Sequence, residues 1–211
     1  NQLFREYVRL LRGLKPKVFI MENVSGMVKG VMKLVFVEIL KELKASGYKV
    51  SARLLNAMYF NVPQSRQRMI FIGVREDLGI EPSHPEAESV PVTVKEAINH
   101  LIKETSELKL HNPSLWDGGS KRFSSIRVNP DKPCPTITKT QRPQSSTGLN
   151  HWIYPQSLSS IELQILGSFP EKFLFSGNSY STITSRIGNS VPPLFMRSIA
   201  RHVRKEILKN G

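Results

Sequence analysis

The amino-acid sequence predicts an α/β fold in which part of a doubly wound sheet is joined to a small domain of short strands and loops. In the first 78 residues, short apolar runs that suit buried strands alternate with amphipathic helices. From about residue 79 the chain becomes richer in Pro, Gly, Ser and Thr. With 211 residues, 39% of them hydrophobic, the chain can form one large domain or two small ones.

The first part of the chain predicts two helices and three strands. In chain order they are a helix over 3–14, a strand over 17–21, a helix that starts near Met32, and strands over 48–55 and 69–74. The run 17–21 is short and continuously apolar, which is typical of a buried parallel strand. The second helix repeats apolar residues every three or four positions and is expected to end before Gly47.

The second part predicts three further helices among loops. Thr93 with Glu96 and Ser159 with Glu162 form capping boxes, which open short helices that end near Ile102 and Gly167. The stretch 112–151 has no helical period and predicts short strands and loops. Pro192-Pro193 suits the start of a last helix, whose apolar face consists of Phe195, Ile199, Val203 and Ile207.

The charge favours a polyanionic partner. Thirty Lys and Arg residues against 17 Asp and Glu give a formal charge of +13, which is typical of proteins that bind nucleic acid. No apolar run is long enough to cross a bilayer. The Lys and Arg residues are not gathered into one juxtamembrane run, so we expect no membrane partner. A single cysteine, Cys134, excludes an internal disulfide and a cysteine-based metal cluster, and we expect a cytoplasmic protein without a metal.

Three groups of residues are candidates for chemistry. Glu22 follows a predicted strand, at the edge where doubly wound sheets build their sites, although a carboxylate there could instead cap a helix. Gln64, Arg66 and Arg68 alternate, so an extended backbone would place them on one face; the alternative is a solvated edge. The third candidate, Gly188-Asn189, could be only a turn before the last helix.

The order of these pieces resembles the C-terminal part of the cytosine-5 DNA methyltransferases. The motifs that carry the resemblance are Glu22-Asn23-Val24, Gln64-x-Arg66-x-Arg68, Pro133-x-Pro135-Thr136-Ile137-Thr138, Phe169-Pro170 and Gly188-Asn189-Ser190-Val191-Pro192-Pro193. Each motif alone is unspecific, but five in this order make coincidence improbable. The resemblance implies the second half of a Rossmann-like methyltransferase sheet, formed by residues 1–78 and 178–211, and a target-recognition domain over 79–177.

The family's chemistry assigns roles to these residues. Its members flip a cytosine out of duplex DNA, attack C6 with a thiolate, and transfer a methyl group from S-adenosylmethionine to C5. By resemblance, Glu22 is the acid at N3, Arg68 grips O2 of the base, and Arg66 makes a phosphate or structural contact. The remaining residues that the resemblance implies are Asn23, Val24 and Gln64 toward DNA, Asn189, Ser190 and Val191 toward the cofactor, and Lys121, Arg122, Arg127 and Lys139 toward DNA phosphates.

The sequence also departs from the family pattern. The family's nucleophile is a cysteine in a Pro-Cys-Gln loop upstream of Glu-Asn-Val, and this sequence contains neither that loop nor the Gly-rich cofactor segment. Cys134 lies in a different motif and is not expected to replace the nucleophile. Gln156, Ile161 and Ile165 stand in a segment where relatives commonly carry arginines, which weakens the prediction of recognition geometry. We therefore expect no methyl transfer by this chain alone.

Several alternatives stay open. The chain could be a truncated piece of a longer enzyme or one subunit of a split enzyme that meets a complementary half; we favour truncation, because residue 1 is not Met and begins within a helix. The alternative from another class is a non-catalytic DNA-binding remnant, against which the intact Glu22, Arg66 and Arg68 argue. A dinucleotide-dependent oxidoreductase has little support, since no Gly-x-Gly-x-x-Gly occurs.

Overall fold

The computed structural model describes residues 2–28, 32–102, 126–141, 147–154, 156–177 and 179–209. The chain forms two compact units. The first comprises Asn1–Asn56, Gln67–Glu86 and Arg197–Gly211, and the second comprises Ala57–Arg66 and Ala87–Met196. The second unit thus takes in two stretches, 57–66 and 178–196, that the sequence analysis placed in the catalytic domain. The division into catalytic and recognition domains at residues 79 and 178 remains a prediction.

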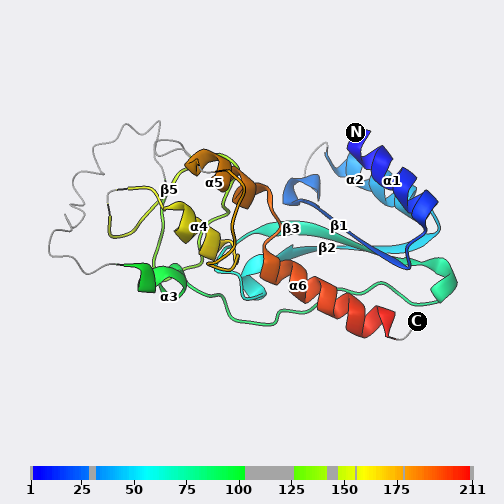
Figure 1. The fold of residues 1–211 in the computed structure, drawn as a ribbon. Coiled ribbons are helices and arrows are strands. Elements are labelled where there is room, and N and C mark those ends of the chain that lie inside the picture. The colour runs from blue at the N-terminus through cyan, green and yellow to red at the C-terminus, as the bar shows by residue number, and fades with distance from the viewer. Residues whose placement is uncertain are drawn as a thin grey trace. The chain divides into compact units, whose positions relative to one another are not determined.

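The first unit contains a three-stranded sheet. Its strands are β1 (Val18–Val24), β2 (Tyr48–Asn56) and β3 (Gln67–Arg75), in the order β1-β3-β2, with β3 antiparallel to both neighbours (Figure 1). The predicted strands are therefore present, but the parallel pairing expected for 17–21 is wrong. Strands β1 and β2 do run in the same direction, and β3 returns between them and takes the hydrogen bonds of both.

Two helices cover one face of this sheet. They are α1 (Gln2–Leu14) and α2 (Met32–Lys44), and they share a core with side chains of all three strands (Figure 1). The Phe19 ring lies across β3 at Gly73, where an added Cβ would stand 2.0 Å from the ring. The same ring meets Tyr48 edge to face at 5.1 Å. Gly73 is thus required for Phe19 to fill the core.

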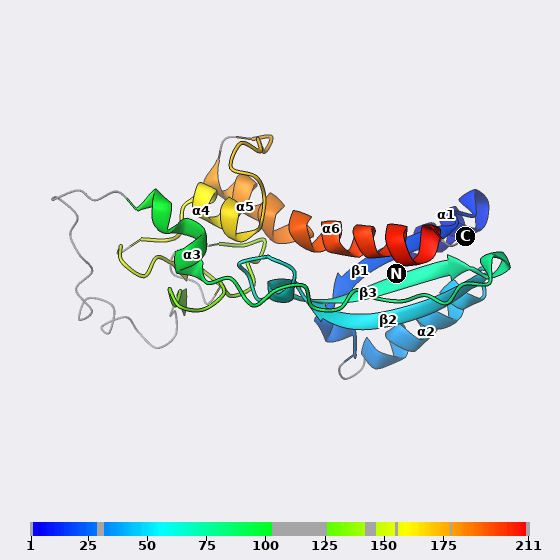
Figure 2. The ribbon, with the colours of Figure 1, turned by 90° about the horizontal axis from the view of Figure 1, so that it is seen from below.

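The C-terminal helix covers the opposite face of the sheet. Helix α6 (Pro193–His202) continues as a π-helical segment over Val203–Leu208, and from Arg197 onward it belongs to the first unit (Figure 2). Ile199, Val203 and Ile207 are buried, and Phe195 is buried within the second unit, which confirms the predicted apolar face. Because both faces of β3 are covered, its residues from Met69 to Val74 are buried almost without interruption.

The second unit is built on short elements around its own core. These are α3 (Val94–Ile98), α4 (Ser160–Leu166), α5 (Tyr180–Asn189) and a two-residue parallel pair, β4 (Ile126–Arg127) with β5 (Leu149–Asn150). Both predicted capping boxes are formed. Across both units, the described residues form short 3-10 turns at Ser25–Val28, Ala57–Tyr59, Glu76–Leu78 and Asn99–Leu101. Helix α5 was not predicted, since its residues are mostly polar and small.

Two further properties follow from the described part of the chain. None of its helices has both the length and the apolar character needed to cross a bilayer. Nor does it contain a cluster of three or more His, Cys, Asp or Glu side chains that could hold a metal ion.

Candidate functional site

Glu22 and Arg68 meet on the α6 face of the first unit's sheet. The Nε atom of Arg68 lies 2.7 Å from Oε1 of Glu22, and the two side chains are 14% and 25% exposed, respectively. Arg68 also donates from Nη1 to the carbonyl of Gln67 at 2.8 Å. The pair is thus fixed in position and still partly open to solvent.

Strand register explains why these two side chains meet. Glu22 is opposite Ile70, and Val24 is opposite Arg68. Alternation places Glu22 and Val24 on one face of β1, and Arg68 and Ile70 on the same face of β3. Glu22 and Arg68 are therefore diagonal neighbours, a separation that two long polar side chains can span. The antiparallel return of β3, which the sequence analysis did not predict, is what brings them together.

The residues beside Glu22 lie at the end of β1. Asn23 alternates to the opposite face, and its Oδ1 accepts a hydrogen bond from the backbone N–H of Val24 at 2.8 Å. The Val24 side chain is 52% exposed. An exposed valine beside a carboxylate and a guanidinium provides an apolar contact next to two polar groups.

Arg66, in the second unit, is bonded to the protein's own backbone. Its side chain is 3% exposed. Nη1 donates to the carbonyl of Ile137 at 3.0 Å, and Nη2 donates to the carbonyls of Gly188 at 2.9 Å and Ser190 at 3.2 Å. One guanidinium thereby holds the Pro-Thr-Ile segment to the Gly-Asn-Ser segment. Of the two roles that the resemblance offered for Arg66, this geometry supports the structural contact.

Gln64 binds the same segment. Its Oε1 accepts from the N–H of Ile137 at 3.2 Å, and its Nε2 donates to the carbonyl of Leu166 at 3.4 Å. Gln64 and Arg66 together bind both polar groups of the Ile137 backbone, as the predicted alternation allows. Arg68 lies at the start of β3 in the other unit and contacts Glu22. The three residues predicted to share one face therefore belong to two sites: Gln64 and Arg66 bind the Ile137 backbone, and Arg68 pairs with Glu22.

Gly188 allows the Gly-Asn-Ser segment to lie against this backbone. A Cβ at Gly188 would stand 2.3 Å from the carbonyl carbon and oxygen of Thr138 and 2.4 Å from the nitrogen of Lys139. Gly188 lies in the last turn of α5, not in a simple turn as one alternative had it. The glycine is therefore required by a close approach of two backbones.

The three predicted cofactor residues lie at the C-terminal end of α5. Asn189 is exposed, and Ser190 and Val191 are half-buried. The Ser190 hydroxyl donates to the carbonyl of Arg186 at 2.6 Å. Within the described part of the chain, Asn189 has no side-chain hydrogen bond, so its amide is the group of the three best placed to bind a ligand.

The predicted phosphate contacts are only partly described. Lys121 and Arg122 lie outside the described residues, as does Trp116. Lys139 is exposed, and Arg127 is exposed with Nη2 donating to the carbonyl of Trp152 at 2.6 Å. Both cations lie in the second unit, which carries the predicted recognition region.

Cys134 is unsuited to nucleophilic attack. Its side chain is fully buried, and burial raises the pKa of its thiol well above the ordinary value, which disfavours the reactive thiolate. Its backbone N–H donates to the carbonyl of Pro63 at 3.0 Å. Cys134 packs in the hydrophobic core of the second unit.

Two further buried polar residues bind the backbone of the second unit. Gln164 donates from Nε2 to the carbonyls of Pro170, Glu171 and Phe173 at 2.7, 3.0 and 3.2 Å, and so shapes the segment after Phe169-Pro170. The Nδ1 atom of His151 accepts from the N–H of Ile153 at 2.9 Å. A lone amide within an apolar helix was the available signal for Gln164.

Comparison with known proteins gives a consistent result. The model of the C-5 cytosine-specific DNA methylase family matches residues 1–129 and 112–205. The chain is 31% identical to the type II methyltransferase M1.HphI of Haemophilus parahaemolyticus, over 97% of this chain and 61% of that protein. It is 30% identical to M.BspRI of Lysinibacillus sphaericus, over 96% of this chain and 54% of that protein. The chain thus spans between half and two thirds of these relatives.

Solved structures share the fold. A putative DNA modification methyltransferase encoded within an Escherichia coli prophage superposes with a TM-score of 0.74 at 20% identity, covering 98% of this chain and 74% of that one. The Dnmt2 methyltransferase of Schizosaccharomyces pombe gives 0.67 at 17% identity, covering 97% and 73%. These likenesses establish an α/β methyltransferase fold. With the family model matching nearly the whole chain, the protein belongs to the C-5 cytosine-specific DNA methylase family.

Proposed function

We propose that this chain is the C-terminal part of a DNA (cytosine-5-)-methyltransferase, and that Glu22 and Arg68 hold one flipped cytosine between them. The contact between the two side chains at 2.7 Å is the observation that carries the proposal. A carboxyl and a guanidinium this close can bind adjacent polar atoms of one small ring. Family membership supplies the class of substrate.

The two side chains have distinct roles in this proposal. A cytosine attacked at C6 by a thiolate gains negative charge, which spreads to N3 and O2 of the ring. The carboxyl of Glu22 shares a proton with N3, and the guanidinium of Arg68 donates to O2, so both groups stabilise the charge where it develops. When the base binds, each side chain exchanges its contact with the other for a contact with the base. Neither polar group is then left without a partner.

S-adenosylmethionine is the expected methyl donor, and it would supply an electrophilic methyl group for C5. The exposed Asn189 amide suits its polar end, and Arg66 keeps the backbone around Gly188 and Ser190 in place. Most of the cofactor pocket and the nucleophilic thiol are expected from segments outside this sequence, either upstream in one longer protein or in a complementary subunit.

The test is a substitution in an enzyme reconstituted with the complementary catalytic segment. Glu22→Gln should lower methyl transfer by roughly 10²–10⁴-fold, because the amide cannot donate its proton as an acid does. DNA affinity should stay nearly unchanged. Glu38→Gln, which alters a carboxylate of α2 away from the Glu22–Arg68 pair, is the matched control. Near-normal turnover of Glu22→Gln would remove this residue from the mechanism.

A further inference from the structure

Three arginines form a stripe on the solvent face of the C-terminal helix. Arg197, Arg201 and Arg204 follow one another at intervals of four and three residues, which places them on one side of the helix. All three are exposed, whereas Ile199 and Val203 are buried within the first unit. We call these three residues the α6 arginine stripe.

The stripe has no acidic partner in the part of the chain that the structure describes. Lys205 pairs with Glu206 at 3.2 Å, and this ion pair does not involve the stripe. Like charges at these spacings repel one another and destabilise a helix. The helix dipole favours cations only in the last turn, so it does not account for Arg197.

An acidic segment that contacts this helix is already neutralised by other cations. Residues 79–86 contribute Glu81, which pairs with Lys49, and Glu86, which pairs with Arg53 at 2.7 Å. The same segment contacts the helix through Ser83, whose hydroxyl lies 2.8 Å from Nε2 of His202. The segment therefore approaches the helix without compensating its arginines.

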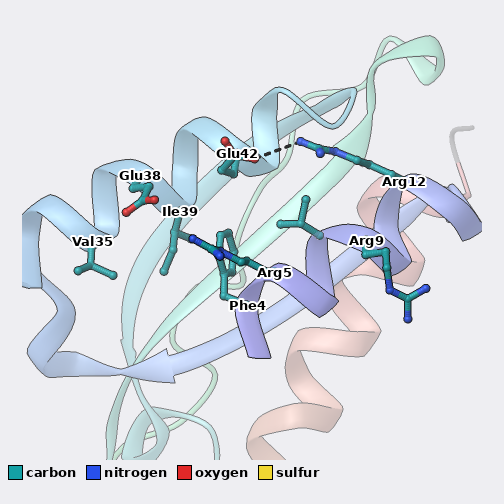
Figure 3. Close-up of a pocket in the computed structure, with 9 residues that line it drawn as sticks. Phe4, Arg5, Arg9, Arg12, Val35, Glu38, Ile39 and Glu42 are labelled. Carbon is teal, nitrogen blue, oxygen red and sulfur yellow. Dashed lines mark hydrogen bonds and ion pairs between the residues drawn. The ribbon is translucent and has the colours of Figure 1, made fainter. Parts of the chain in front are cut away.

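Helix α1 provides an internal comparison. Arg5, Arg9 and Arg12 have the same spacing of four and three residues. They line a groove of about 440 Å³ whose other wall carries Glu38 and Glu42 of α2 (Figure 3). Arg12 pairs with Glu42 at 3.1 Å, and Arg9 pairs with Glu6 at 2.7 Å. Two of the three arginines of α1 thus pair with carboxylates, whereas the described residues provide no such pair for the stripe on α6.

We propose that the α6 arginine stripe binds the phosphate backbone of duplex DNA, as a sequence-independent contact separate from the Glu22–Arg68 site. Seven residues of helix rise about 10 Å, and phosphates of one strand follow at about 3.4 Å along the DNA axis, so the stripe can span roughly three phosphates. Guanidinium groups suit this partner, because they bind phosphate oxygens in bidentate fashion. The choice of DNA as the polyanion rests on the proposed function.

The test measures DNA affinity as a function of salt. The full chain carrying Arg197→Gln, Arg201→Gln and Arg204→Gln is titrated with a random-sequence duplex of about 30 base pairs. Glutamine preserves helix propensity at these exposed positions, and circular dichroism checks the fold. We expect affinity to fall roughly tenfold or more, and the slope of log K against log salt to become shallower by about 3, since each phosphate contact contributes about 0.9.

The matched control is Arg5→Gln, Arg9→Gln and Arg12→Gln, which removes the same charge at the same spacing from α1. If the stripe is a specific contact, this control should change the slope by less than one. An equal loss in both variants would mean that net charge alone acts, and no loss in the α6 variant would mean that the stripe does not touch DNA. Either result overturns the proposal.

Failure of this proposal is distinguishable from failure of the proposed function. Methyl transfer by the reconstituted enzyme, measured with a saturating concentration of DNA, depends on Glu22 and not on the stripe. The α6 variant should therefore keep its turnover rate at saturating DNA. It should need a higher concentration of DNA to reach saturation. Loss of turnover at saturation would contradict a role confined to DNA binding.

Discussion

At the scale of single residues, the motif Gln-x-Arg-x-Arg contains two functions. Gln64 and Arg66 bind the backbone of Ile137 and hold the second unit together, whereas Arg68 faces the carboxylate of Glu22 in the first unit. A side chain that is 3% exposed and donates to three carbonyls has little left to offer a ligand. Arg66 thus supports the site through packing and does not contact the base.

We expect Arg66→Gln to lower the free energy of unfolding of the chain by roughly 2–4 kcal/mol. The substitution leaves carbonyls of Ile137, Gly188 and Ser190 without a donor, and each buried unsatisfied group costs about 1–3 kcal/mol before relaxation. Arg66→Lys should recover part of this loss. Urea denaturation measures both variants; a change below about 0.5 kcal/mol for Arg66→Gln would be typical of a surface residue and would contradict the buried role.

At the scale of secondary-structure elements, the sequence analysis was correct for the features that depend on residues close together in the chain. The periodic helices, both capping boxes and the three strands of the first unit were predicted from sequence, because each depends on residues close together in the chain. The pairing of β1 was predicted wrongly, since a continuous apolar run marks burial on both faces but not the direction of the neighbouring strand. Helix α5 was missed because Ser, Thr, Gly and Asn dominate it, and its stability comes from packing.

The same limit applies to the site. The identities of Glu22 and Arg68 followed from motifs, but their contact depends on the register of β3 against β1, which no local pattern encodes. The glycine of Gly-Asn-Ser likewise looked like a turn residue. Its reason for being glycine lies 50 residues away, at the backbone of Thr138.

A glycine pair tests this explanation at the element scale. Gly188→Ala should destabilise the chain by roughly 1–3 kcal/mol, because the new methyl group meets backbone atoms that cannot move aside as a side chain can. Gly13→Ala, in the last turns of α1, has nothing within 4 Å of the added Cβ and should be neutral or stabilising. Thermal denaturation compares the two; equal effects would show that the close approach at Gly188 does not constrain the fold.

At the scale of the whole molecule, each unit carries a buried histidine. Burial, and secondarily the charge of Arg53, lowers the pKa of His84 to about 4, and burial lowers the pKa of His151 to about 4. His84 lies 3.2 Å from the Ser51 hydroxyl, and His151 stacks on Trp152 with centroids 4.0 Å apart. Nδ1 of His151 accepts backbone hydrogen bonds and cannot take a proton without losing them.

Stability should therefore fall as the pH is lowered from about 6.5 toward 4. In this window the unfolded chain protonates both histidines and the folded chain does not, so the unfolded state is favoured. At pH 5 the expected loss relative to pH 7 is about 2 kcal/mol for His84. It is smaller for His151, because the carboxylate of Glu162 lies 3.4 Å from its Nε2 and favours the protonated ring. Urea denaturation at several pH values measures the slope, which His84→Gln and His151→Gln should each reduce. A free energy of unfolding that is flat between pH 7 and 5 would contradict this.

The extent of the chain leads to a prediction about activity. It spans 61% and 54% of two type II methyltransferases that it resembles, and its one cysteine is buried. We expect no 5-methylcytosine when the chain alone is incubated with S-adenosylmethionine and duplex DNA. Addition of a complementary segment that carries an accessible catalytic cysteine should restore transfer. Robust turnover by the purified chain alone would show that the nucleophile has been assigned to the wrong place.

The measurement that tests the central claim most directly is a double-mutant cycle between Glu22 and Arg68. Single-turnover methylation by the reconstituted enzyme is compared for Glu22→Gln, Arg68→Gln and the double variant. If both side chains stabilise one and the same flipped cytosine, the double variant should lose little beyond the more damaging single change. Losses that simply multiply would mean that Glu22 and Arg68 act independently, and would contradict the account.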